Sequence, residues 1–414
     1  MKRSIPVPQE SFARLNTNQL GVFGSVAPGF EEVAVRFREN FHRRREVGAA
    51  CCIYHKGAKV VDLWGGYCDL STRTAWAEDT LILVFSATKG LASMTLAVAH
   101  SQGLIDYEER VSVYWPEFAQ QGKENITVRQ LLSHQAGLCV TDEPVDATTL
   151  ASPDQLAQLL ARQKPLWEPG TRYAYHAFTL GWYEGELIRR VDPQHRTLGK
   201  FFQDEIAKPL GLEFYIGLPA EVPDSRLARW KFPSPFDFFF RTNKMSRPFL
   251  NSILQRKSLA HRFLTQSRSF DARNRAFLAL ENPGFTGVGR VSSIARAYSE
   301  FATGGRELGI TPRTLAALTA APDPPTCGEF DEMIRLDVAY SLGFLRSRPN
   351  LRFGSSDKVF GAPGAGGSFA FADYDSQVGF AYAPLRMGLC LFDDPREKVL
   401  RDTFYQCLEK FSEK

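Results

Sequence analysis

β-rich segments at both ends of the chain enclose a helical middle, and this arrangement constrains the fold more than any other feature of the sequence. Residues 49–69, AACCIYHKGAKVVDLWGGYCD, contain two runs of strand-forming side chains around Lys56 and Gly57, which is typical of a hairpin. Strand-like runs return beyond about residue 335. They cover residues 338–347, 368–375, 377–384 and 387–394.

Amphipathic periodicity predicts helices before, between and after these strand-like runs. Sheets and amphipathic helices must each bury a face, so we expect an antiparallel sheet flanked by terminal helices, with a helical domain inserted into it. This is an α/β (α+β) class, with residues 1–95 and 286–414 in the sheet domain and residues 96–285 in the helical domain. The expected helices cover residues 29–45, 87–103, 127–135, 153–163, 178–190, 197–208 and 395–411.

Composition excludes several classes of protein. The net charge of +4 is small for a chain of 414 residues, so nucleic acid is not indicated as a partner. No stretch approaches 18 uncharged apolar residues, which argues against an integral membrane segment. The first 16 residues have two basic side chains but no apolar core behind them, so we expect no secretory signal.

The seven cysteines indicate free thiols in a reduced compartment. They stand at positions 51, 52, 68, 139, 327, 390 and 407, an odd count without any CxxC spacing. We therefore expect a cytoplasmic protein with buried thiols rather than a disulfide framework. The histidines show no metal-binding spacing, so neither a metal nor an organic cofactor is expected.

Residues 81–90, LILVFSATKG, place Ser86 and Lys89 three positions apart at the end of an apolar run. If a helix begins near Ser86, Lys89 lies one turn on and on the same face. The free N–H groups of the helix start could then stabilise an oxyanion, and a buried lysine could accept the serine proton. Serine is also a common helix cap, so this tetrapeptide alone does not decide between catalysis and an ordinary helix start.

Two further segments follow in a recognisable order. DTLILVFSATKG (79–90) is followed by ITVRQLLSHQAGL (126–138) and LWEPGTRYAYHAFTLGW (166–182). Together they resemble the serine β-lactamase and penicillin-binding-protein superfamily, and within it the family VIII carboxylesterases and other class C β-lactamase-like hydrolases. The resemblance runs from about residue 30 to about residue 400. It implies a β-lactamase/transpeptidase-like fold and an acyl-enzyme mechanism.

The resemblance assigns roles to three side chains. It places Ser86 on the family's acylated serine and Lys89 on its motif lysine. The family's second motif has a tyrosine shortly after Pro-Gly-Thr, here residues 169–171, and both Tyr173 and Tyr175 are candidates. Spacing favours Tyr175. Lys89 and Tyr175 then share the work of base and acid, and the sequence leaves open which of them takes the Ser86 proton.

The third motif of the family falls within VFGAPGAGGSFAFADYD, residues 359–375. The alignment places Ala362, Pro363 and Gly364 where β-lactamases have Lys-Thr-Gly. The resemblance then implies that the N–H of Ala365 joins the N–H of Ser86 in an oxyanion hole. The alternative interpretation is a glycine-rich turn that leads into a strand.

Two departures from the β-lactamase pattern favour an ester as substrate. The asparagine that β-lactamases carry two residues after the tyrosine is Ala177 here, with His176 between them, and the third-motif lysine is Ala362. Those groups bind the amide and carboxylate of a lactam, and a neutral ester needs neither. We predict that His176, Ala177, Ala362 and Gly364 contact the substrate. His134 is instead expected to be a structural hydrogen-bonding residue.

The segment 226–275 is basic and aromatic. It contains twelve lysines and arginines against two aspartates, together with the run FPSPFDFFF. It is either a solvated insertion packed on the body of the protein, or a lid that lines an acyl pocket or meets an acidic or membrane surface. We expect substrate specificity to be set here.

These observations favour a serine hydrolase that cleaves a small-molecule ester through a Ser86 acyl-enzyme. Three alternatives remain open on the sequence. They are an acyltransferase that uses the same intermediate, a weak β-lactamase or D-amino-acid peptidase, and a non-catalytic relative that serves as a binding or filament protein. The acyl and alcohol groups and the oligomeric state are not specified.

Overall fold

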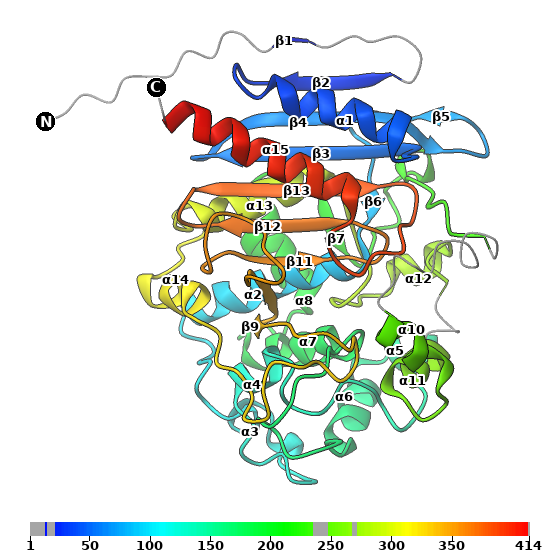
Figure 1. Cartoon of the computed structure of the whole chain (residues 1–414). Helices are drawn as coiled ribbons and strands as arrows, with labels where there is room; N and C mark the ends of the chain where they lie inside the picture. The colour runs from blue at the N-terminus through cyan, green and yellow to red at the C-terminus, as the bar shows by residue number, and fades with distance from the viewer. Residues whose placement is uncertain (1–12, 15–20, 235–246, 267–270, 413–414) are drawn as a thin grey trace, which may run out of the picture.

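The computed structural model describes residues 13–14, 21–234, 247–266 and 271–412, and its centre is one long antiparallel sheet (Figure 1). The strands run in the order β1-β2-β4-β3-β13-β12-β11-β10-β9, with β5 paired to β4. Their bounds are β1 Ala13–Arg14, β2 Val22–Val26, β3 Gly48–His55, β4 Ala58–Asp69, β5 Thr74–Ala75, β9 Tyr340–Ser341, β10 Phe344–Arg346, β11 Phe360–Pro363, β12 Phe369–Asp373 and β13 Val378–Pro384.

Helices occupy both faces of the sheet and most of the segment between its two halves. Their bounds are α1 Glu31–Arg43, α2 Thr88–Ser101, α3 Val111–Tyr114, α4 Val128–Leu132, α5 Ala147–Leu150, α6 Pro153–Arg162, α7 Thr179–Val191, α8 Leu198–Phe202, α10 Arg247–Leu254, α11 Leu259–Gln266, α12 Arg275–Ala279, α13 Val291–Ala302, α14 Pro312–Thr319 and α15 Pro395–Ser412. A second, three-stranded sheet has the order β6-β8-β7, with β6 Ile82–Leu83, β7 Phe214–Ile216 and β8 Gly287–Gly289.

The two ends of the chain meet in the middle of the large sheet. Strand β3 pairs antiparallel with β13, from His55 opposite Val378 to Ala49 opposite Pro384. The expected antiparallel sheet built from both ends of the sequence is therefore confirmed, as are the hairpin at Lys56–Gly57 and the terminal helices α1 and α15. The domain limits at residues 95 and 286 stay a prediction.

Side chains alternate between two hydrophobic cores along the central strands, because successive residues of a strand point to opposite faces. Cys51 lies in the core under α1 and α15, whereas Cys52 lies in the core that contains Ile294 and Tyr298 of α13. Figure 1 shows α1 and α15 together on the near face, with α13 behind the sheet. The sheet is thus covered on both sides.

Helix α2 is buried on all sides. All of its residues from Thr88 to His100 are buried, which is the pattern of a helix that crosses the middle of a core. It packs against α7 and α8 and also contacts strands β10 and β11 of the large sheet. The helix therefore links the sheet to the helical region, and its N-terminal end is where Ser86 and Lys89 lie.

Three sequence expectations differ from the structure, and two of its elements were not expected. Residues 387–394 do not form a strand, because the Gly388 N–H donates to Gly366 O and the apolar side chains that follow pack into a cavity. Residues 338–347 form two short strands, since Leu342 and Gly343 turn the chain with positive φ angles. The helix expected over 127–135 ends at Leu132. The three-stranded sheet and α13 were not foreseen.

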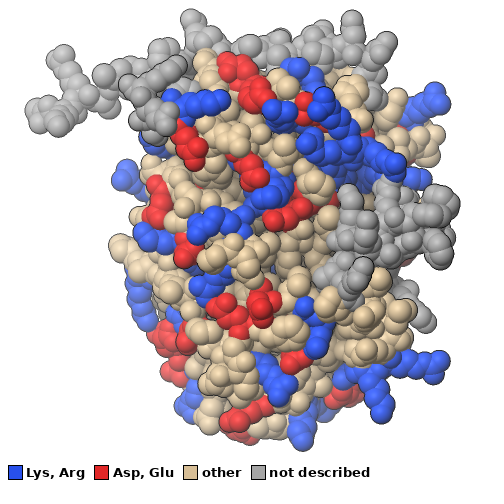
Figure 2. Space-filling model, in the orientation of Figure 1, with Lys and Arg blue, Asp and Glu red and all other residues tan. Residues whose placement is uncertain are grey.

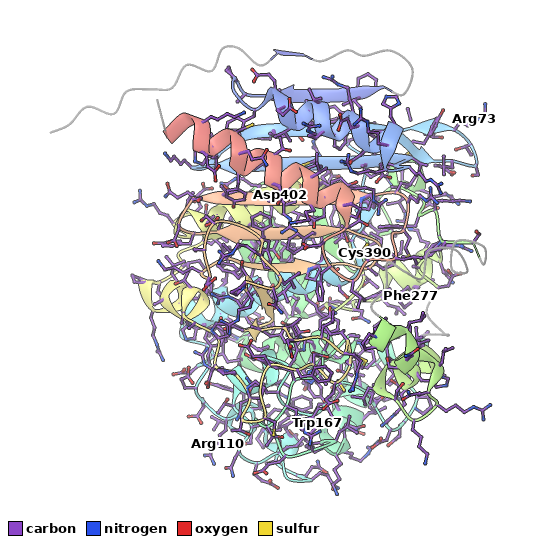
Figure 3. All side chains as sticks on the ribbon, viewed as in Figure 1. Arg73, Arg110, Trp167, Phe277, Cys390 and Asp402 are labelled. Carbon is purple, nitrogen blue, oxygen red and sulfur yellow. The ribbon has the colours of Figure 1, made fainter. Side chains whose placement is uncertain are left out.

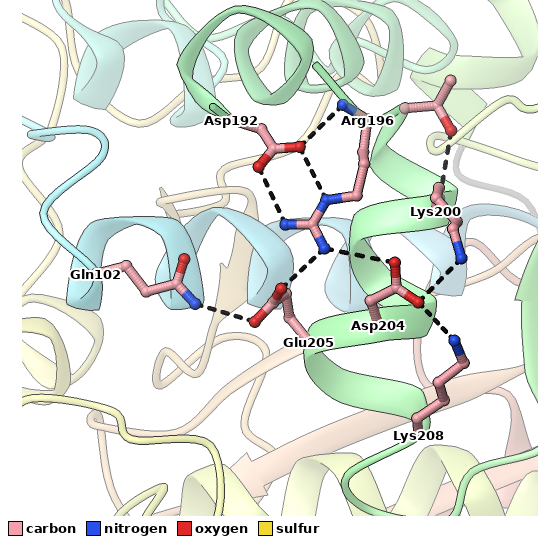
Figure 4. Close-up of polar contacts among 8 residues, drawn as sticks. Gln102, Asp192, Arg196, Lys200, Asp204, Glu205 and Lys208 are labelled. Carbon is pink, nitrogen blue, oxygen red and sulfur yellow. Dashed lines mark hydrogen bonds and ion pairs between the residues drawn. The ribbon is translucent and has the colours of Figure 1, made fainter. Parts of the chain in front are cut away.

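An ion-pair network fixes the corner between α7 and α8 (Figure 4). The Arg196 guanidinium donates to both carboxylate oxygens of buried Asp192, at 2.9 and 3.0 Å, and to Glu205 at 2.9 Å. Arg196 also lowers the pKa of Asp192. Gln102, which follows α2, donates to Glu205 at 3.1 Å. The network therefore joins the far ends of α2 and α7, so it fixes how these two helices lie against each other.

The surface in Figure 2 carries basic and acidic side chains interspersed with one another. All seven cysteines are free, and five of them are buried. Among the described helices, none combines the length and the apolar character that crossing a bilayer requires. The described residues also contain no group of three or more His, Cys, Asp or Glu side chains placed to hold a metal ion.

We expect Phe404→Ala to destabilise the protein by about 3–5 kcal/mol, the usual cost of removing a buried aromatic side chain. Phe404 of α15 is fully buried, and its ring stacks on Phe30 at a centroid distance of 5.0 Å. Urea unfolding measures the change. Gln406→Ala, an exposed site on the same helix, is the matched control and should stay within about 0.5 kcal/mol of the wild type. Equal losses of stability in the two variants would contradict the contribution of the buried Phe404 ring to the packing of α15.

Candidate active site

Ser86 lies on a strained turn that leads into α2. It belongs to a 3₁₀ turn, Phe85–Ala87, and is less buried than its neighbours. Phe85 has a φ of 48°, a left-handed conformation that costs a bulky residue about 1–3 kcal/mol. The Phe85 ring packs against Trp230 and Phe285, at centroid distances of 4.9 and 5.2 Å. These contacts hold the backbone in a shape that turns Ser86 toward a cavity.

Lys89 lies one turn after Ser86 and is almost completely buried. Its Nζ donates to Ser86 Oγ at 3.2 Å, to Ala177 O at 2.6 Å and to Gly284 O at 2.7 Å. The three acceptors come from three distant parts of the chain. Because an ammonium group has three N–H donors, this set fixes the amine beside the serine hydroxyl.

Burial lowers the pKa of Lys89 to about 7, although the Glu184 carboxyl acts in the opposite direction. Removal from water disfavours the charged form of the amine, and three neutral acceptors compensate for this only in part. A lysine with a pKa near neutrality can exist as a free amine at physiological pH. It can therefore accept a proton from Ser86.

Of the two candidate tyrosines, Tyr175 is the one that lies beside Ser86. Burial raises the pKa of the Tyr175 phenol, and a hydrogen bond with Ser86 lowers it in part. The Lys89 Nζ lies 5.0 Å from the centre of the Tyr175 ring. Tyr173 is also fully buried, but its hydroxyl donates to Tyr340 O, at 3.5 Å. The structure therefore brings together Ser86, Lys89 and Tyr175.

Strand β11 ends against the turn that carries Ser86. A side chain on Gly364 would collide with Val84 O, 2.2 Å from an added Cβ, so glycine is needed for this close approach. The Ser368 hydroxyl donates to the same Val84 oxygen at 3.0 Å, and Gly364 N donates to Ser368 O. The loop that contains Ala365 is thus tied to the chain just before Ser86.

The two histidines near the tyrosine have different surroundings. His134 accepts a hydrogen bond from the His176 backbone N–H at 3.0 Å, and its ring also contributes to the cavity wall. His176 is fully buried and is not among the residues that line the cavity, so the structure does not bring it to the position that we predicted for it. Burial and the nearby Lys89 lower the pKa of His176 to about 3, which keeps its ring neutral.

Ser86 and Lys89 open onto a cavity of about 190 Å³. Ala177, Ala362, Gly364 and Ala365 line it, so the structure brings these four residues to the cavity, and their roles toward a substrate stay a prediction. Among the described lining residues, Lys89 is the only Lys, Arg, Asp or Glu. The larger apolar and aromatic lining side chains are Phe178, Phe249, Phe263, Phe285, Met333, Ile334, Tyr175, Tyr340, Leu345, Pro363, Leu391 and Phe392.

Several of these wall residues could not be named from the sequence. Phe249 of α10 and Phe263 of α11 belong to the aromatic and basic segment, which was the available signal. Most of the FPSPFDFFF run lies outside the described residues. Cys390, labelled in Figure 3, belongs to the segment before α15 and lies between the sheet and helices α10 and α11. Gly284, which accepts from Lys89, follows an Asn-Pro turn signal that was not recognised.

The sequence matches the family described as "Beta-lactamase" over residues 33–395. The chain belongs to the beta-lactamase family. It is 31% identical over 375 residues to the esterase/beta-lactamase LipL of Mycobacterium tuberculosis (strain ATCC 25618 / H37Rv), a match that covers 88% of this chain and 83% of LipL. The expected membership of the β-lactamase-like superfamily is confirmed.

Solved structures of beta-lactamase-family proteins share the fold. A family VIII carboxylesterase is 37% identical, with a TM-score of 0.79, over 93% of this chain and 99% of the other. A penicillin-binding protein homologue from Caulobacter crescentus is 32% identical, with a TM-score of 0.82 and the same two coverages. The β-lactamase/transpeptidase-like fold is therefore confirmed, and the protein is a serine hydrolase of the beta-lactamase fold with esterase neighbours.

We expect Tyr175→Phe to slow the reaction of Ser86 with a fluorophosphonate by about 10²-fold or more, the usual size of a general acid–base contribution. Tyr173→Phe, the matched control two residues away, should change the rate less than about threefold because its hydroxyl bonds elsewhere. Both rates are measured by quenching the labelling reaction at several times and determining the intact mass of the protein. A larger loss in Tyr173→Phe than in Tyr175→Phe would overturn the alignment of the second motif.

Proposed function

We propose that the protein is a serine carboxylesterase that cleaves neutral esters through an acyl-enzyme on Ser86. One observation carries this proposal: Ser86 hydrogen-bonds to Lys89 at the wall of a cavity whose other described lining residues carry no Lys, Arg, Asp or Glu. A hydroxyl is a weak nucleophile until a base accepts its proton, and Lys89 is within reach to do so. An uncharged, mainly apolar cavity suits an uncharged, mainly apolar acyl group.

The first half of the reaction forms the acyl-enzyme. The Ser86 oxygen attacks the ester carbonyl carbon while its proton passes to the Lys89 amine, directly or through Tyr175. The carbonyl oxygen becomes an oxyanion, which the N–H groups of Ser86 and Ala365 stabilise. The carbon–oxygen bond to the alcohol then breaks, and the alkoxide takes the proton back from the Lys89–Tyr175 pair as it leaves.

The second half returns the enzyme to its starting state. A water molecule attacks the acyl carbon and gives a proton to the same Lys89–Tyr175 pair. Ser86 leaves as the carbon–oxygen bond of the acyl-enzyme breaks, and it recovers its proton. A carboxylic acid is released. An alcohol in place of water would give a new ester, so transfer and hydrolysis differ only in this step.

Lys89 is the better first proton acceptor of the two groups. Burial lowers its pKa to about 7, whereas burial raises the pKa of the Tyr175 phenol further from neutrality. A neutral amine is therefore available at physiological pH, and a phenolate is not. Tyr175 then relays the proton and orients the serine hydroxyl.

Among the described residues that line the cavity, no second Lys or Arg joins Lys89, and this favours esters over lactams. Ala177 and Ala362 line the cavity where β-lactamases have an amide and a lysine for the substrate. A penicillin or cephalosporin would bring a carboxylate that no described lining residue other than Lys89 could pair with, and a buried unpaired charge is costly. We also propose a reducing compartment such as the cytoplasm, because all seven thiols are free.

We expect p-nitrophenyl acetate or butyrate to leave an acyl group on Ser86, detectable by intact mass after rapid quenching. Ser86→Ala, a change of a single oxygen atom, should show neither adduct nor turnover above background. A chromogenic cephalosporin should react at least about 10²-fold more slowly than the esters. Turnover by Ser86→Ala at the wild-type rate would refute the proposal. Turnover that appears only when an acceptor alcohol is added would identify the protein as an acyltransferase.

We expect Phe263→Ala to shift preference toward longer acyl chains. A cavity of about 190 Å³ holds roughly six water-sized volumes, hence an acyl group of about that many non-hydrogen atoms. The Phe263 ring closes the wall and packs on Phe178 at 4.9 Å. The ratio of kcat/KM for octanoate to butyrate esters should rise roughly tenfold.

Leu264→Ala is the matched control for this change, because the Leu264 side chain is 37% exposed on the same helix and does not line the cavity. In Leu264→Ala, the octanoate-to-butyrate ratio of kcat/KM should stay within about twofold of the wild-type ratio. An unchanged ratio in Phe263→Ala would show that the segment 226–275 does not set acyl specificity at this position.

A further inference from the structure

Glu184 is a buried carboxyl group that the mechanism above does not use. It lies on α7 and is completely inaccessible to solvent. Its Oε1 accepts a hydrogen bond from the Ser93 hydroxyl at 2.8 Å, and its Oε2 has no hydrogen-bond partner among the described residues. Burying a carboxyl group with one unpartnered oxygen costs free energy, because buried charges need partners.

The position of Glu184 relates it to Lys89. Ser93 follows Lys89 by four residues on α2, so the two side chains lie on the same face of that helix, one turn apart. Glu184 therefore contacts α2 one helical turn after Lys89, toward the C-terminal end of the helix. The packing of α2 against α7 sets this spacing, and the network around Arg196 fixes the far ends of both helices.

A glycine separates this carboxyl group from the cavity. Gly343 lines the cavity, and a Cβ added to it would lie 1.9 Å from Ser93 Oγ and 3.2 Å from Glu184 Oε1. The carboxyl group thus sits directly behind the wall, screened from solvent but close to the site. In such a medium, charges interact much more strongly than in water.

Other titratable groups also face this pair. The imidazoles near Lys89 stay neutral, because burial lowers their pKa values, and burial raises the pKa values of the phenols. None of these groups carries a charge near pH 7, so the ionised form of Glu184 is the one described group of opposite sign that acts on the Lys89 amine. These neutral groups are His134, His176, Tyr107 and Tyr175.

We propose that Glu184 is a positioning residue that sets the protonation state of the Lys89 amine through a buried charge interaction from behind the cavity wall. The proposal rests on the proposed function, in which Lys89 accepts the Ser86 proton. Lys89 and Glu184 act as a coupled pair, in which the charge on either group favours the charge on the other.

The sign of the effect follows from the charges. Burial raises the pKa of Glu184 to about 8, and both Ser93 and Lys89 lower it in part. In return the carboxylate raises the pKa of Lys89. A carboxyl group with a pKa of about 8 is ionised in only part of the molecules near pH 7. Its removal should therefore lower the pKa of Lys89 by a fraction of a unit, so the free amine should form at a slightly lower pH. Removal of the Ser93 hydroxyl should raise the pKa of Glu184 and act in the same direction.

The pH dependence of Ser86 labelling by a fluorophosphonate tests this proposal. In the wild type the rate should rise with pH as the Lys89 amine loses its proton. In Glu184→Gln, which keeps the shape of the side chain, the midpoint should move down by about 0.3 pH unit, so that the rate at pH 6 relative to pH 9 rises about twofold. Glu184→Asp keeps the charge and should move the midpoint less.

Ser93→Ala provides a second variant that leaves the carboxyl group in place. Its midpoint should also move down, and the double variant with Glu184→Gln should show no further shift, because the hydroxyl acts through the carboxylate. Thermal unfolding of each variant is measured in parallel. A lower melting temperature with an unmoved midpoint would show a structural role only and would overturn the proposal.

Failure of the two proposals gives different results. If the wild type is not labelled, or if Ser86→Ala is labelled equally, the proposed function is wrong. If the wild type is labelled on Ser86 but the midpoints of Glu184→Gln and Ser93→Ala match that of the wild type, only the role of Glu184 is wrong.

Discussion

The burial of the Lys89 amine is the interaction on which the rest of the site depends. Taking an ammonium group out of water is costly, and the protein offsets the cost with carbonyl oxygens rather than with a direct ion pair. Those oxygens belong to Ala177 and Gly284, which are 88 and 195 residues away from Lys89 along the chain. The amine is thus held firmly while its pKa stays near 7. A base prepared in this way needs only a hydroxyl within reach, and Ser86 supplies it.

Close backbone packing makes this arrangement possible. A Cβ on Gly181 would lie 1.9 Å from Gly284 N, and a Cβ on Gly364 would lie 2.2 Å from Val84 O. Gly181 lets the loop that accepts from Lys89 approach α7, and Gly364 lets the end of β11 approach the chain just before α2. The strained φ of Phe85 belongs to the same design, because packing elsewhere sustains a conformation that presents the serine.

The sequence predicted what depends on local spacing and missed what depends on tertiary packing. Ser86 and Lys89 share one helical turn, so their proximity could be predicted without the fold. Gly284 and Phe263 reach the site from separate segments. The basic and aromatic composition of residues 226–275 indicated a pocket wall as one alternative, but no local pattern singled out Phe263 or Gly284. Glu184 offered a weak signal, since it occupies an apolar face of α7. The strand expected over 387–394 was wrong because apolar residues that line a cavity and apolar residues that face a core look alike in sequence.

The pairing of β3 with β13 has a consequence for how the protein is made. A chain emerges from the ribosome N-terminal end first, so the serine and its lysine are synthesised long before residues 378–384. Until the last strands arrive, β3 lacks its neighbour and the wall formed by β11 does not exist. An unfinished or truncated chain therefore lacks an assembled site, and hydrolytic competence arises only in the last steps of synthesis.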